Sequence, residues 1–239
     1  MKKIFLIASL STLLIVVGFS AVLFKSKIPR YFVSNDKNVV AIYNKYCPNK
    51  IKLNYKNTDY SEDFFATNSQ LNIDELSKKL MNGEYKDNQV SSALRVFGGK
   101  LMSDKFKFDD GYSIIKCSAE KYYNMSAIYL LARFYDYGTD SVQKAYPQMV
   151  IINKIKPDKK LEYFWIVSLF YLEFIEQTNL LTLDTTLGWN SWAMLDNLQM
   201  GGELSDKDLI DIENQSRNFI SKKYPKELNN DYRLYNHKL

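Results

Sequence analysis

Apolar residues recur at helical spacing along most of the chain beyond residue 70. The stretch NIDELSKKL, residues 72–80, places Leu76 and Leu80 on one face, and Asn72 and Glu75 have the spacing of a capping box. This pattern predicts a helix that begins after Asn72. The same periodicity predicts further helices over residues 91–102, 111–123, 125–138 and 160–177.

The last helix is predicted to begin at Ser205, because Asp208 follows at the third position and an apolar stripe runs on before Pro225. One predicted helix contains the strongly apolar run FWIVSLFYLEF, residues 164–174, with acidic residues at intervals. A run of this length suits a buried core helix better than a membrane span. Few glycines and prolines, 9 and 5 in 239 residues, agree with a mainly helical chain.

Residues 5–24 form an uncharged apolar stretch of 20 residues after the short tail 1–4. At about 1.5 Å per residue a helix of this length spans a bilayer core of about 30 Å. The sequence favours an uncleaved anchor, because apolar residues continue past a possible cleavage site at residues 18–20, but a secretory signal peptide stays open. A very short N-terminal tail normally remains in the cytoplasm, which places residues 31–239 outside it.

The net charge of +5 belongs to the N-terminal segment. Residues 1–30 contain five basic and no acidic residues, and 27 of each kind follow. A nucleic-acid-binding domain needs a basic face, so the balanced remainder argues against nucleic acid as a partner.

Cys47 and Cys117 are the two cysteines of the chain. Outside the cytoplasm they could form a disulfide that closes a 70-residue loop, and two unrelated buried thiols are the alternative. Two cysteines and the single His237 do not suffice for an ordinary zinc site, and no metal or cofactor is predicted.

A repeat of 34 residues connects two of the predicted helices. Aligning SALRVFGGKLMSD with SAIYLLARFYDYG places Ala93 on Ala127 and Gly98 on Ala132. Small residues at these positions allow a neighbouring helix to approach closely, and larger residues fill the next layer. Gly138 can adopt the left-handed conformation that ends a helix.

On these residues the sequence resembles the Sel1-like repeat family, relatives of the tetratricopeptide repeats. Ala127, Leu131, Ala132, Tyr135 and Gly138 match the first half of the repeat pattern at its spacing, with alanine in place of its first glycine. The second half is approximated, shifted by one residue and with larger side chains, by Asp158, Lys160, Leu161 and Phe164. The resemblance covers about residues 90–175, and it departs from the family in the long loop 139–157.

The resemblance implies an all-α fold, a short solenoid of αα-hairpins. We expect five parts along the chain: a cytoplasmic tail, an anchor or signal helix, a tether with an irregular cap that includes a short helix near residues 39–46, a helical repeat domain, and a C-terminal tail. Their bounds are 1–4, 5–24, 25–70, 71–225 and 226–239.

Catalytic chemistry is poorly represented in the sequence. His237 lies two residues from the C-terminus, and no nucleophile elbow, phosphate-binding loop or zinc-protease motif occurs. The acid pairs Asp109–Asp110 and Glu173/Glu176 could serve a glycoside hydrolase, but such pairs are usually solvated. The sequence therefore predicts a protein that is not an enzyme.

The residues predicted to bind a protein partner lie around the best repeat and in the loop after it. Tyrosine is favoured at the centre of interfaces, and MVIINKI, residues 149–155, is apolar for a loop, so it either packs on the helices or contacts a partner. The candidates are Tyr122, Tyr123, Tyr137, Tyr146 and Ile151.

Small proteins that look like this one often act in the bacterial envelope, and one recurring role is immunity. The first hypothesis is therefore a protein at the periplasmic side of the inner membrane, or released into the periplasm after cleavage, that blocks a secreted toxin such as a phospholipase. The alternative is a membrane-anchored scaffold or regulator of envelope assembly or signalling. An enzyme that uses carboxylates is the third.

Overall fold

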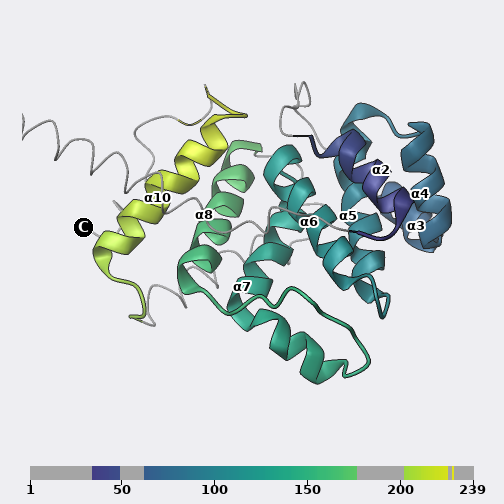
Figure 1. Cartoon of the computed structure of the whole chain (residues 1–239). Helices are drawn as coiled ribbons and strands as arrows, with labels where there is room; N and C mark the ends of the chain where they lie inside the picture. Colours follow the sequence, from purple (N-terminus) through teal and green to yellow (C-terminus); the bar gives the residue numbers. More distant parts are fainter. Residues whose placement is uncertain (1–33, 49–61, 177–201, 226–227, 229–239) are drawn as a thin grey trace, which may run out of the picture. The chain divides into compact units, whose positions relative to one another are not determined.

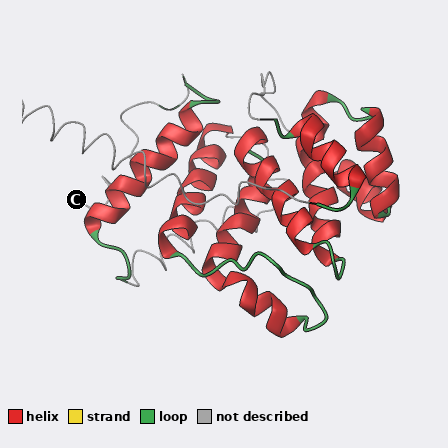
Figure 2. Cartoon of the chain, in the orientation of Figure 1, coloured by secondary structure: helices red, strands yellow, loops and turns green. Residues whose placement is uncertain are grey.

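The computed structural model describes residues 34–48, 62–176, 202–225 and 228, all within one compact unit, Ser34–Leu239. In these ranges the regular structure is entirely helical, which confirms the all-α prediction for this part of the chain (Figures 1 and 2). The helices are α2 (Lys37–Tyr46), α3 (Glu62–Gln70), α4 (Ile73–Asn82), α5 (Asp87–Ser103), α6 (Phe108–Tyr122), α7 (Met125–Ala145), α8 (Lys159–Glu176) and α10 (Asp206–Ser221).

Local capping sequences determine where two of these helices begin. The Asn72 side chain accepts a hydrogen bond from the Glu75 amide, and the Glu75 carboxylate accepts one from the Asn72 amide, so the predicted capping box of α4 is confirmed. Ser205 likewise accepts a hydrogen bond from the Asp208 amide and caps α10, as predicted. Such contacts satisfy amide donors that have no partner inside the helix.

From α4 onward, the described helices pack on their neighbours along the chain. α4 contacts α5, followed by α6, α7, α8 and α10 in turn, while α2 lies against α4 and α3 against α5 (Figure 1). The core is continuous across α6, α7, α8 and α10.

The apolar run of α8 lies in the middle of this core. Every residue from Glu162 to Leu172 is buried, which confirms that the segment is a core helix. None of the helices in the described ranges combines the length and the apolar composition that crossing a bilayer requires.

The small residues of the 34-residue repeat are buried, and Gly98 lies at a close helix contact. Ala93, Ala127 and Ala132 are fully buried, and so is Leu131. A side-chain carbon on Gly98 would lie 3.0 Å from the carbonyl oxygen of Gly111, so α5 and α6 approach through their backbones. Two larger repeat positions also belong to the core, Phe164 as a buried residue and Tyr135 as a partly buried one.

Gly138 interrupts α7 without ending it. Its φ of 67° is positive, as expected, but its ψ of 168° directs the chain into a further helical segment that continues to Ala145. A side-chain carbon at this position would lie 2.7 Å from the ring of Pro157, so the site requires glycine for space as well as for conformation. The predicted break in the helix at Gly138 is therefore present, whereas the helical segment that follows it up to Ala145 was not predicted.

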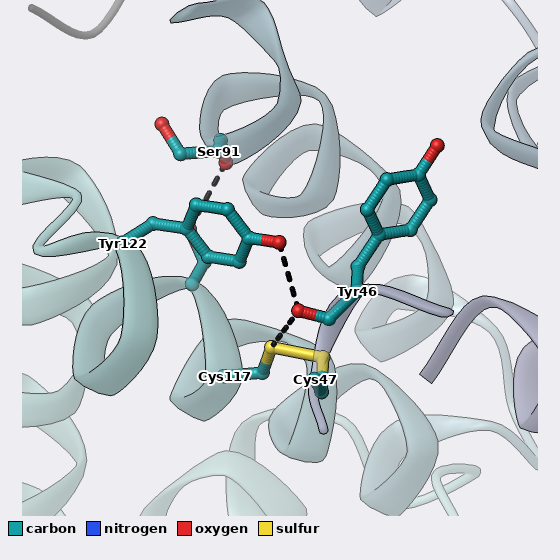
Figure 3. Close-up of a disulfide and its surroundings, with 6 residues drawn as sticks. Tyr46, Cys47, Ser91, Cys117 and Tyr122 are labelled. Carbon is teal, nitrogen blue, oxygen red and sulfur yellow. Dashed lines mark hydrogen bonds between the residues drawn. A yellow bond between two sulfur atoms is a disulfide. The ribbon is translucent and has the colours of Figure 1, made fainter. Parts of the chain in front are cut away.

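Within the described residues 34–48 and 62–70, the chain is more regular than predicted. The short helix expected near residues 39–46 is present as α2, and α3 follows it where an irregular cap was expected. Cys47 at the end of α2 and Cys117 on α6 form a disulfide with their Cα atoms 5.8 Å apart (Figure 3). The Tyr122 hydroxyl donates a hydrogen bond of 2.8 Å to the Tyr46 carbonyl beside this disulfide (Figure 3).

Some of the predictions concern residues outside the described ranges. These residues are the tail 1–4, the apolar segment 5–24, the beginning of the tether, the stretch 177–201 of the predicted repeat domain, and the predicted C-terminal tail 226–239 with His237, except residue 228.

Candidate functional site

The structure separates the five predicted partner-binding residues into two groups. Tyr137 and Tyr146 have exposed fractions of 51% and 58%, so both can contact a partner. Tyr122, Tyr123 and Ile151 are buried, with exposed fractions of 6–7%, so the described surface does not present them to a partner.

The two buried tyrosines are held by partners that are distant in sequence. Tyr122 reaches α2, as described above, and the Tyr123 hydroxyl donates to the Phe219 carbonyl at 3.2 Å. The Tyr123 ring also stacks on the Phe219 ring, with a centroid distance of 4.7 Å. Burial raises the pKa of Tyr123 to about 12, so its hydroxyl stays protonated. Both residues fasten helices together.

Tyr137 is exposed but fixed in position by Arg133, one helical turn earlier on α7. The Arg133 guanidinium lies over the Tyr137 ring at 4.3 Å from its centroid. It also donates a hydrogen bond of 2.6 Å to the Tyr137 hydroxyl. The pair therefore presents an aromatic ring and a cation in one arrangement at the surface.

An ion-pair network between α7 and α8 supports this arrangement. Asp136 accepts from Arg133 at 3.2 Å and from Lys159 at 3.1 Å, and Lys159 also contacts the carboxylate of Glu162 at 2.9 Å. Burial raises the pKa of Glu162 above its ordinary value, and the hydrogen bond from Lys159 opposes that rise. The network links Arg133 to a buried group, which limits the motion of the exposed pair.

The long segment between α7 and α8 alternates between core and surface. Met149 and Ile151 are buried against Phe108, whereas Val150 and Ile152 are exposed. Successive residues of an extended chain point to opposite sides, so one short stretch both packs on the helices and presents apolar side chains outward. Met149 and Ile151 of MVIINKI therefore pack on the helices, as one alternative predicted, while Val150 and Ile152 remain accessible.

Hydrogen bonds hold this segment against α6 and against the turn before it. The Val150 amide donates to the Lys105 carbonyl at 2.8 Å. The Asp109 carboxylate accepts from the amides of Ile152 and Asn153 at 2.9 and 2.8 Å. The segment is therefore ordered by backbone contacts that do not depend on its exposed side chains.

Two of the acidic residues considered for catalysis have structural contacts. Asp109 binds the loop amides, and Asp110 accepts a hydrogen bond from Ser34 at 2.8 Å. Burial raises the pKa of Asp110 above its ordinary value, with the Ser34 hydrogen bond acting against it. Glu173 is partly buried on α8, and the side chain of Glu176 lies outside the described residues.

A shallow, polar depression lies between the N-terminus of α4 and the C-terminus of α5. The depression is lined by Asn72, Ile73, Asp74, Lys100, Ser103 and Asp104. It contains two carboxylates and a hydroxyl, and it lacks a histidine that could activate the hydroxyl.

Across the described ranges no three histidine, cysteine or acidic side chains are grouped so that they could hold a metal ion.

Comparison with protein-family models, with curated proteins and with solved structures gave no match. The resemblance to Sel1-like repeats accordingly remains a prediction from the residues quoted for it.

Sequence reasoning missed two residues of the surface. Arg133 is one helical turn before Tyr137, a spacing at which side chains on a helix meet, so their contact was open to prediction. Phe106 has an exposed fraction of 70% in the turn between α5 and α6. An aromatic residue between Lys105 and Lys107 in a turn was the available signal.

Proposed function

We propose that this chain is a non-catalytic protein-binding module, built as a short solenoid of Sel1-like αα-hairpins. Two features support the solenoid. The helices from α4 to α10 pack in chain order, and the small residues of the 34-residue repeat are buried, with Gly98 at the close contact of α5 with α6. In such an architecture each hairpin contacts its neighbours and leaves an extended surface for a partner.

The observation that carries the binding role is the exposed pair Arg133 and Tyr137. Arginine and tyrosine are the residue types that contribute most often to binding energy at protein interfaces. Here each holds the other, and Asp136, which is also paired with Lys159, holds Arg133. The two side chains therefore lose little conformational entropy when a partner binds them, which favours affinity.

The disulfide between Cys47 and Cys117 supports export from the cytoplasm. Disulfides persist in oxidising compartments such as the periplasm and are rare where cellular thiols keep cysteines reduced. Together with the apolar segment 5–24, this supports a place at the periplasmic side of the bacterial inner membrane, with release after cleavage as the other route.

Within that compartment we propose immunity as the role: the chain covers the active cleft of a secreted toxin of the lipase type. A stoichiometric blocker needs an exposed binding surface and no catalytic residues of its own, and the acids Asp109 and Asp110 have structural contacts here. A lasting scaffold for envelope proteins would use the same fold but would not inhibit its partner.

The test uses tagged full-length chain as bait, with Arg133→Ala and Tyr137→Ala as variants and Lys78→Ala, an exposed residue of α4, as the matched control. Wild type and control should retain one stoichiometric hydrolase. Each surface variant should weaken its binding by about 30-fold, the equivalent of a 2 kcal/mol hot spot.

The captured hydrolase is then assayed with and without the chain. Loss of its activity on binding supports occlusion, and deletion of the chain's gene should make cells sensitive to the toxin of their neighbours. A bound hydrolase that remains fully active would contradict immunity. Weak retention of several envelope proteins, unaffected by the two variants, would favour the scaffold.

A further inference from the structure

Arg95, in the middle of α5, carries a charge that no residue in the described part of the chain balances. Its Nε atom is buried and has no hydrogen-bond partner. Among the described residues no carboxylate pairs with it, and burial lowers the pKa of its guanidinium. The positions one turn before and after it on α5 are Ser91, Ser92, Gly98 and Gly99, so its own helix places no acid beside it.

The other two arginines in the described part of the chain have partners. Arg133 contacts the Asp136 carboxylate at 3.2 Å, and Arg217 donates to the Tyr171 hydroxyl at 3.5 Å. A long cationic side chain that only covers apolar surface keeps its polar atoms in water, whereas the Nε atom of Arg95 is inside. An unbalanced cation that is partly withdrawn from water costs stability. Arg95 therefore has much to gain from an anion that comes from outside the chain.

The end of the Arg95 side chain borders an open space on the surface of α5. Gly99, one turn further on, is partly exposed. Apart from its own helix, the one described atom within 4 Å of a side-chain carbon on Gly99 would be Nη1 of Arg95, at 4.0 Å. A side-chain carbon on the adjacent Gly98 would instead meet the Gly111 carbonyl oxygen at 3.0 Å. Gly98 thus serves helix packing, and Gly99 leaves room beside the guanidinium.

The 34-residue repeat relates this space to the exposed pair on α7. One repeat after Arg95 and Gly99 the chain has Tyr129 and Arg133. In a solenoid, equivalent positions of successive hairpins face the same side, so Arg95 lies on the side that presents Arg133. This step rests on the proposed function. Where α7 has the side chain of Arg133, α5 has a glycine and open space.

We propose that Arg95 binds a carboxylate of the protein partner, from an aspartate or glutamate side chain that enters the space over Gly99. The planar fork of a guanidinium matches the two oxygens of a carboxylate and binds them through parallel hydrogen bonds. One cation with uncharged neighbours on its helix balances the single charge of a carboxylate, whereas a phosphate carries a larger charge. The free chain bears the cost of the unpaired cation, and the complex removes it.

The first experiment follows the Nε–Hε signal of Arg95 in NMR spectra of the isotope-labelled full-length chain. The absence of this signal from Arg95→Met assigns it. Sodium acetate, the carboxylate probe, replaces sodium chloride at constant ionic strength, and inorganic phosphate is titrated into a parallel sample. The signal of Arg133 is the internal control, because its guanidinium is already paired with Asp136.

The proposal predicts a saturable shift of the Arg95 signal with acetate and none at Arg133. Gly99→Leu, which fills the space with a side chain, should abolish the shift, whereas Gly99→Ala should keep it. The absence of a shift with acetate, or an unchanged shift in Gly99→Leu, would overturn the proposal. A shift with phosphate and none with acetate would overturn the carboxylate as the ligand.

Urea unfolding of Arg95→Met separates a binding role from a structural one. An apolar side chain of similar length removes the unpaired charge, so this variant should unfold at a urea concentration no lower than wild type does. Arg133→Met is the matched comparison, because it removes a paired arginine, and it should unfold at a lower concentration. A clear loss of stability in Arg95→Met would mean that the chain itself uses the charge, and the proposal would fail.

Capture of the partner by the full-length chain tests the carboxylate in its own complex. Arg95→Met should weaken binding by at least about tenfold, the usual loss for a hydrogen bond to a charged group. If Arg133→Ala weakens capture and Arg95→Met does not, Arg95 has no role in binding, and the proposed function remains. The acetate titration needs no partner, so the proposal for Arg95 is tested even if the proposed function fails.

Discussion

Gly98 of α5 and Gly111 of α6 are in direct backbone contact. A side-chain carbon on Gly111 would lie 2.5 Å from the carbonyl oxygen of Gly98 and equally close to the amide nitrogen of Met102. Atoms of this kind do not approach so closely, and the obstructing atoms belong to the backbone, which cannot rotate away. The packing of α5 on α6 therefore depends on hydrogen at both glycine positions.

We predict that Gly111→Ala lowers the free energy of unfolding by about 1–3 kcal/mol, the usual cost of overpacking. Gly99→Ala is the matched control, because the nearest atom to its side-chain carbon is the flexible end of Arg95 at 4.0 Å. That variant should gain about 0.5–1 kcal/mol from higher helix propensity. Urea unfolding of the three proteins measures both effects, and equal destabilisation by the two substitutions would contradict the proposed contact.

The parts of the fold that were predictable are those encoded by a few consecutive residues. The capping box of Asn72 and Glu75, the cap at Ser205 and the buried run of α8 each follow from local spacing, and the structure contains all three. Local spacing did not predict the path that the chain takes after such a signal. At Gly138 the sequence predicts a break, but contacts with Pro157 and Ile155, far along the loop, determine the path of the chain after it.

The candidate site shows the same division. The exposure of Tyr137 was predictable from its position after the packing residues of the repeat. The burial of Tyr122 and Tyr123 was not, because it depends on Tyr46 and Phe219, which are 76 and 96 residues away in sequence. A cluster of tyrosines can form a surface or fasten helices together, and only the long-range contacts distinguish the two.

The disulfide between Cys47 and Cys117 should contribute a large part of the stability of the unit. It closes a loop of 70 residues, and in the chain-entropy model such a cross-link stabilises by about 4 kcal/mol. We predict a loss of this size for the double variant Cys47→Ala/Cys117→Ala in urea unfolding. Wild type in reductant should behave like the variant, and a variant as stable as the oxidised protein would contradict this role.

Asp109 should control the order of the segment before α8. Its carboxylate accepts hydrogen bonds from the amides of Ile152 and Asn153, so Asp109→Ala should accelerate hydrogen exchange at those two amides and cost about 1.5–3 kcal/mol of stability. Asp140→Ala is the control, because its ion pair with Lys154 is exposed and should contribute little. Unchanged exchange at Ile152 in the Asp109 variant would show that other contacts hold the segment.

Glu162 should make the protein less stable as the pH rises above the ordinary carboxyl range. Burial raises the pKa of its carboxyl in the folded state, so between the unfolded value of 4.5 and the higher folded value the native protein binds more protons than the unfolded one. The contribution is therefore present below pH 4.5 and is lost as the pH rises through the folded pKa. Glu162→Gln should remove this loss in unfolding experiments across the pH range.

Asp36 provides a control of opposite sign. The hydrogen bond from Lys107 lowers the pKa of the Asp36 carboxyl below 3.8, so its contribution is present above that value and is lost as the pH falls through the lowered pKa. Asp36→Asn should change only the acid side of the stability profile. A profile in which Glu162→Gln and Asp36→Asn have the same effect would contradict both assignments.

The polar contact between α8 and α10 should contribute to stability because it lies inside the core. The Tyr171 hydroxyl donates to the Glu213 carboxylate and also accepts a hydrogen bond of 3.5 Å from Arg217, and all three residues are buried. Tyr171→Phe keeps the ring but removes the hydroxyl that both charged groups contact. Withdrawing one partner from buried charged groups costs about 1–3 kcal/mol, so we predict a loss of that size in urea unfolding. Tyr137→Phe removes a hydroxyl that also bonds to an arginine, but at the surface, where water replaces the lost contact, and it should cost well under half as much. If both variants lose the same stability, burial does not determine how much the Tyr171 contact contributes.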